Sequence, residues 1–63
     1  MTAMAEPREN VWIGWLEFAS ETDGSVLRTD EETSQPTIDA VAYWASGLEP
    51  VYLDGALGRA KRR

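Results

Sequence analysis

The sequence predicts a small α+β domain in which a three-stranded antiparallel sheet carries one helix on one face, in the chain order β-β-α-β. Three observations support this prediction. The segment 11–19 is rich in β-branched and aromatic residues, the segment 26–29 follows a hairpin turn, and the segment 51–54 alternates, as strands do. Between the second and third of these segments, apolar residues recur with helical spacing. A chain of 63 residues has room for a single domain.

The first predicted strand, 11–19, reads VWIGWLEFA and holds two of the three tryptophans. The pair Asp23-Gly24 after it is typical of a hairpin turn, because glycine accepts the positive φ that tight turns need. The segment 26–29 then returns as a second strand.

A loop of four residues in this hairpin fixes the register of the two strands. It sets Phe18 opposite Leu27 on one face and Glu17 opposite Arg28 on the other, an apolar pair and a charge pair.

The predicted helix covers residues 36–46, with Pro36 at its first position and Asp39 in its first turn. Gly47 ends it. Its apolar stripe consists of Ile38, Val41, Ala42 and Ala45. After Pro50, the alternating segment 51–54 predicts the third strand, and Asp54-Gly55 a second turn.

This chain order places the longest and most apolar strand, 11–19, in the middle of the sheet, in the spatial order 2-1-3. Residues 1–9 lack periodicity and predict a flexible lead-in, residues 10–55 form the compact domain, and residues 56–63 are a basic tail or a short extra strand.

One helix cannot cover both faces of a sheet, so one face of the first strand needs another cover. The helix is assigned to the face of Trp12, which leaves an apolar strip on the other face. We expect that strip to be a protein interface formed by Val11, Ile13, Trp15, Glu17 and Arg28. We expect a second copy of the chain, in a two-fold dimer, to cover this face. The alternative is that the segment 56–63 folds over it as a fourth strand and packs Leu57 against the apolar strip.

Charge is distributed unevenly along the chain. The net charge is −5, with 11 acidic and 6 basic residues. Four of the six basic residues lie in the last five positions, so the body before them is strongly acidic. An acidic body attracts basic protein surfaces and repels nucleic acid and membranes, although acidity also serves solubility or salt adaptation. The expected acidic contact surface comprises Asp30, Glu31, Glu32 and Asp39.

The basic tail offers cations to phosphates or to acidic surfaces, through Arg59, Lys61, Arg62 and Arg63. The other interpretation is a solubilising tail that folds back on the acidic body of its own or a neighbouring subunit.

The sequence holds no His and no Cys, the residues on which most nucleophilic catalysis depends. The run Asp30 to Glu32 lacks the spacing of a calcium loop. We therefore expect no enzyme activity, cofactor or metal. The N-terminus resembles no signal peptide and no apolar run is long enough to span a bilayer, which predicts a cytoplasmic protein.

Two functions from different classes follow from these features. The favoured one is an acidic, non-catalytic protein-binding module acting as an oligomer, with an inhibitor or nucleic-acid mimic that binds a basic partner surface as a sharper version. The alternative is a nucleic-acid-associated protein that contacts phosphates through the tail.

Overall fold

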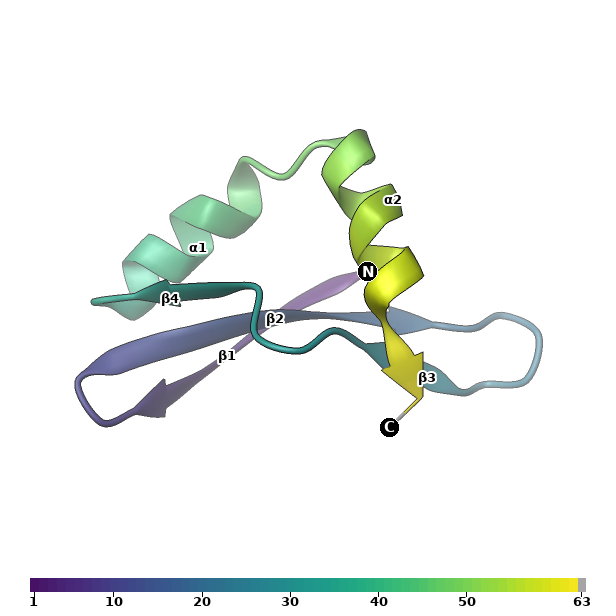
Figure 1. The fold of residues 1–63 in the computed structure, drawn as a ribbon, viewed down its shortest axis with the longest axis horizontal. Helices are drawn as coiled ribbons and strands as arrows, with labels where there is room; N and C mark the ends of the chain where they lie inside the picture. Colours follow the sequence, from purple (N-terminus) through teal and green to yellow (C-terminus); the bar gives the residue numbers. More distant parts are fainter. Residues whose placement is uncertain (63) are drawn as a thin grey trace.

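A computed structural model describes residues 1–62 and shows one antiparallel sheet with two helices on one of its faces (Figure 1). The elements are β1 (Thr2–Arg8), β2 (Val11–Ala19), β3 (Val26–Arg28), β4 (Thr33–Gln35), α1 (Ile38–Ser46), α2 (Pro50–Arg59) and β5 (Lys61–Arg62). The α+β class is as predicted. The sheet is larger than the three strands expected and a second helix is added.

The sheet is built around β2. Its strands lie in the order β1-β2-β3-β5, and β4 pairs with β2 beside β3. The predicted hairpin register is confirmed, since Phe18 pairs with Leu27 and Glu17 with Arg28. Gly24 has a φ of 73°, a backbone conformation that residues with a Cβ atom rarely adopt.

The first nine residues form a strand in place of a flexible lead-in. β1 pairs with β2 from Thr2 opposite Glu17 to Arg8 opposite Val11, through a tight turn in which Glu9 has a φ of 54°. Its sequence, TAMAEPR, has little strand preference of its own. The strand forms because the backbone groups along this edge of β2 need partners.

The opposite edge of β2 is shared by two short strands, β3 and β4, which are separated by a bulge. The Thr29 N–H donates to Leu16 O at 2.9 Å, and the Glu32 N–H donates to Gly14 O at 2.9 Å. Between these bonds, Asp30 and Glu31 make the chain bulge away from β2. The hydroxyl of Thr29, a fully buried residue, accepts from the Leu16 N–H at 3.0 Å and so replaces a missing backbone acceptor.

Helix α1 begins two residues later than predicted, because Thr37, which follows Pro36, is its N-cap. The Thr37 hydroxyl accepts from the Ala40 N–H at 3.1 Å. Its buried residue is Val41, whose Cγ1 would lie 3.0 Å from a Cβ at Gly14. The Trp12 face of β2, to which Gly14 belongs, is therefore the face that α1 covers, as predicted.

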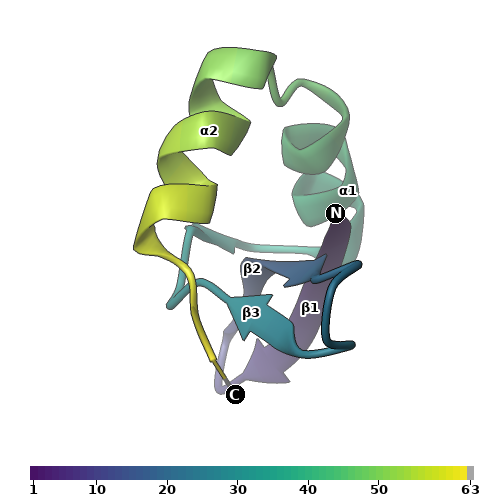
Figure 2. The ribbon, with the colours of Figure 1, turned by 90° about the vertical axis from the view of Figure 1, so that its right-hand side faces the viewer.

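Helix α2 occupies the segment predicted as the third strand. Pro50 stands in its first turn, where a missing N–H costs nothing, and Ala56 is fully buried. Viewed along the sheet, α1 lies over the β1 side and α2 over the β3 side (Figure 2). The predicted order 2-1-3 is thus wrong in its third strand, although its central strand is correct.

The tail returns to the sheet, where Lys61 and Arg62 form β5 against β3. Arg63 lies outside the described residues. Neither α1 nor α2 has the length and apolar content that a membrane-crossing helix needs, and residues 1–62 contain no other α-helix.

Candidate functional site

The five residues expected at a protein interface lie on one face of the sheet, opposite the helices. Register places Ile13 and Trp15 beside Glu6 and Met4 of β1, and Glu17 beside Arg28 of β3. Ile13 is only 4% exposed and Trp15 only 8% exposed.

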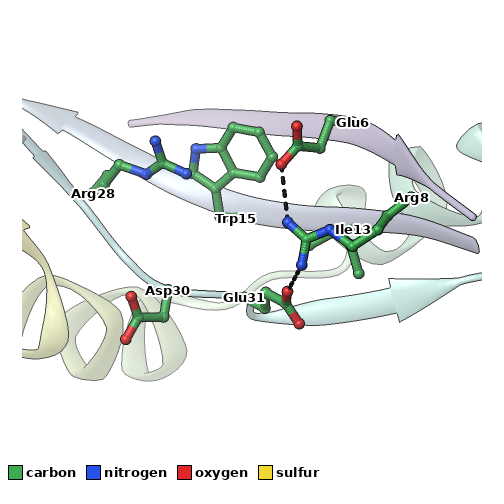
Figure 3. Close-up of a pocket in the computed structure, with 7 residues that line it drawn as sticks. All are labelled: Glu6, Arg8, Ile13, Trp15, Arg28, Asp30 and Glu31. Atoms are coloured by element: carbon green, nitrogen blue, oxygen red, sulfur yellow. Dashed lines mark hydrogen bonds and ion pairs between the residues drawn. The ribbon is translucent and has the colours of Figure 1, made fainter.

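Long charged side chains of the same chain cover this face (Figure 3). The guanidinium of Arg28 lies 4.8 Å from the centre of the Trp15 ring, and the Trp15 indole N–H donates to Glu17 at 3.1 Å. These contacts bury apolar rings beneath polar groups.

Beside Ile13, the guanidinium of Arg8 bridges two carboxylates. It bonds to Glu6 at 3.2 Å and to Glu31 of the bulge. A second chain is therefore not required to bury Ile13 and Trp15, contrary to the expectation. Residues 56–62 do not cover this face either, because β5 extends the sheet at its edge and Leu57 stands 46% exposed on α2.

A hollow of about 470 Å³ remains on this face, lined by three acidic and two basic side chains around Ile13 and Trp15. Three of the five charges are already paired with one another, as the bridging Arg8 shows (Figure 3). Mixed charges that satisfy one another offer a ligand little net field.

The four acidic residues expected to form one contact surface are dispersed by the fold. Glu31 is paired with Arg8, and Asp30 lines the hollow of the same face. Asp39 lies in the first turn of α1, and Glu32 points to α2.

Glu32 anchors α2 to the sheet. Its side chain is 8% exposed and its Oε1 accepts from the Tyr52 hydroxyl at 2.5 Å and from Arg59 at 2.6 Å. Burial alone would raise the pKa of Glu32, but the hydrogen bonds from Tyr52 and Arg59 outweigh it and lower the pKa. The hydrogen bond that the Tyr52 hydroxyl donates to Glu32 raises the pKa of Tyr52. This carboxylate is a structural anchor.

The tail cations meet carboxylates of their own chain. Arg59 is bound to Glu32, and Arg62 bonds to Asp23 in the hairpin turn at 3.0 Å. Hydrogen bonds from the backbone N–H and the side chain of Ser25, followed by the hydrogen bond from Arg62, hold the pKa of Asp23 well below its usual range. Lys61 is exposed in β5.

Sequence reasoning missed an apolar groove between β1 and α1, here named the β1–α1 groove. It has a volume of about 620 Å³. The residues that line it are Met1 with Ala3, Met4 and Ala5 of β1, and Ile38, Val41, Ala42, Ala45 and Ser46 of α1. Ile38 is 48% exposed. The predicted apolar stripe of the helix was the available signal, because only Val41 within it is buried and the rest of the stripe borders this groove.

The groove adjoins an unpaired strand edge, because β1 ends the sheet within the described chain. The Gly14 carbonyl accepts from the Glu32 N–H, and the backbone C=O and N–H of Leu16 both bond to Thr29. Even-numbered residues of β2 therefore turn their backbone groups away from β1. Backbone groups alternate along a strand, so odd-numbered residues of β2 bond to β1.

The β1–β2 register carries this alternation over to β1. Thr2, Met4, Glu6 and Arg8 face β2, whereas Ala3, Ala5 and Pro7 turn outward. Pro7, which has no N–H, therefore stands where no ladder bond is lost.

Across residues 1–62, no three His, Cys, Asp or Glu side chains gather closely enough to hold a metal ion. No family model, curated protein or solved structure matches this chain. Function must therefore be inferred from the arrangement of its own residues.

Proposed function

We propose that the chain is a non-catalytic protein-binding module that binds through the β1–α1 groove and the outward edge of β1. The observation that supports it is the juxtaposition of these two features. An apolar groove of about 620 Å³ runs beside a strand edge with open backbone N–H and C=O groups. Added strands use such an edge for affinity and an adjacent groove for specificity.

The face of Trp15 is a weaker candidate for the same role. Its apolar side chains are already buried, and Arg8 and Arg28 that cover them would have to move before a partner could contact them. The tail is a weaker candidate for nucleic acid, because Arg59 and Arg62 are paired with carboxylates of the chain.

Site-specific photo-crosslinking tests the proposal. A benzoylphenylalanine side chain replaces exposed Ala42 at the groove, and a matched probe replaces exposed Asp54 on α2. We expect protein adducts in cells from the Ala42 probe and far fewer from the Asp54 probe. Equal yields from the two positions, or no adduct at Ala42, would contradict the assignment of this surface.

A further inference from the structure

We propose that the occupant of the β1 edge is the β1 strand of a second copy of this chain, paired antiparallel about a two-fold axis at Met4. This inference rests on the proposed function, since it names the partner of the same surface. Three features support it: the outward hydrogen-bonding groups of β1, the charge of the groove, and the side chains on both sides of the strand.

The outward groups of β1 are self-complementary in one register. With the axis at Met4, Ala3 of one copy lies opposite Ala5 of the other. Both residues turn their N–H and C=O outward, as the alternation along β1 shows. Each Ala3–Ala5 pair then exchanges two hydrogen bonds, and the two-fold axis generates the second pair.

Pro7 disfavours the neighbouring register. With the axis at Ala5, Ala3 would lie opposite Pro7, whose ring nitrogen has no hydrogen to give to the Ala3 carbonyl. With the axis at Glu6, two carboxylates would face each other across the seam. The axis at Met4 avoids both and sets Glu6 opposite Thr2.

The charge of the groove favours a copy over a basic partner. Although the chain carries 11 acidic residues, none of the side chains that line the groove is charged. A basic protein would therefore meet no carboxylate inside it. Two acidic chains, by contrast, can approach along this strip of uncharged side chains with little repulsion.

The side chains fit the same arrangement. A two-fold axis perpendicular to the sheet places both α1 helices on one face of the continuous sheet. Ala3 and Ala5 point to this face and are small, which leaves room for half-exposed Ile38 and for Ala42 of each copy above the seam. On the other face, Met4 meets Met4 of the second copy.

Sedimentation velocity between about 10 µM and about 1 mM tests the association, since weak interfaces have dissociation constants in this range. We expect a dimer. Ala5→Pro removes one outward N–H without removing a bond to β2, and Ala42→Glu places a charge in the groove. Each should raise the dissociation constant at least about tenfold. Val51→Glu is the matched control, because Val51 is 84% exposed on α2, outside the groove lining.

Circular dichroism establishes that each variant is folded, and Ala42→Glu at an exposed position keeps the test valid if Ala5→Pro is not. A wild-type monomer throughout this range would overturn the inference. A dimer that resists both substitutions would overturn it as well, by placing the contact on another face.

Disulfide formation tests the register, because the chain has no native Cys. Met4→Cys places two thiols opposite each other at the axis and should yield a covalent dimer under mild oxidation. Glu6→Cys should not, because its two copies would stand about 13 Å apart along the strands, beyond the roughly 7 Å between Cα atoms that a disulfide tolerates. The reverse pattern would refute this register.

The crosslinked adducts from the Ala42 probe separate this inference from the proposed function. Adducts with twice the mass of the chain support self-pairing. Adducts only with other proteins would overturn self-pairing while leaving the binding module in place.

Discussion

Gly14 lies where α1 packs on the sheet, and a side chain at this position would crowd its neighbours. A Cβ at this position would lie 2.8 Å from Thr33 Cγ2 and 3.0 Å from Val41 Cγ1. Both neighbours are β-branched and stiff. We expect Gly14→Ala to destabilise the fold by about 1–3 kcal/mol, as overpacking does.

Urea unfolding measures this loss. Gly58→Ala is the control, since the added methyl on α2 meets no described atom within 4 Å and should stabilise the helix by about 0.5–1 kcal/mol. Similar effects of the two substitutions would show that Gly14 is not a packing constraint.

Glu32 should make the stability of the protein depend on pH. Its pKa is lowered from the ordinary value of 4.5 in the folded state. The stability it contributes is therefore present above pH 4.5 and is lost as the pH falls through the folded pKa. We expect Glu32→Gln to cost about 1–3 kcal/mol at neutral pH, because a buried charged acceptor is lost.

The difference in unfolding free energy between wild type and Glu32→Gln should shrink as the pH falls from 6 to 2, a window set by that lowered pKa. The neighbouring Glu31→Gln provides the control, because the Glu31 side chain is 53% exposed. A difference that stays constant over this pH range would show that Glu32 is not ionised in its contacts with Tyr52 and Arg59.

At the scale of elements, local signals predicted the β2–β3 hairpin and long-range pairing decided the rest. Asp23-Gly24 and the apolar run of β2 specify the register that the structure confirms. β1 carries no comparable signal, since Ala, Glu and Pro prefer other structures and only β2 makes this segment a strand.

The segment after Pro50 shows the limit of short patterns. Alternation over 51–54 fits a strand, but four residues also fit one turn of a helix. Asp54-Gly55, read as a turn, lies inside α2. Of the candidate site, the shared face of Ile13 and Trp15 was predictable. Its cover was not, because Arg8 and Glu31 meet only through β1 and the bulge.

The two ends of the chain should differ in their importance to the fold. Removing residues 1–8 leaves one edge of β2 unpaired and removes Glu6 and Arg8, whose side chains lie beside Ile13. We expect this deletion to abolish cooperative thermal unfolding. Removing residues 61–63 takes away the two-residue β5 and the exposed ion pair between Arg62 and Asp23, and it should preserve cooperative unfolding. Cooperative unfolding of the N-terminal deletion would show that β1 is dispensable.

Across the whole molecule, stability should be concentrated in β2 and lowest in α2. The buried residue of α2 is Ala56, its N-cap Glu49 makes no side-chain hydrogen bond, and Gly55 and Gly58 weaken it. Native-state hydrogen exchange should therefore show α2 amides opening at lower free energy than the amides of Gly14 and Leu16. Equal opening energies would mean that the helix and the sheet unfold as one unit.

The sequential pairing of the strands has a consequence for biosynthesis. Among the described elements, β1 to β4 lie within the first 35 residues and all pair through β2, whereas β5 alone joins from the far end of the chain. A chain emerging from the ribosome can therefore assemble its sheet in the order of synthesis, with short loops to close at each step. A nascent chain released at residue 47 should already protect the Leu16 amide from exchange, and one released at residue 28 should not.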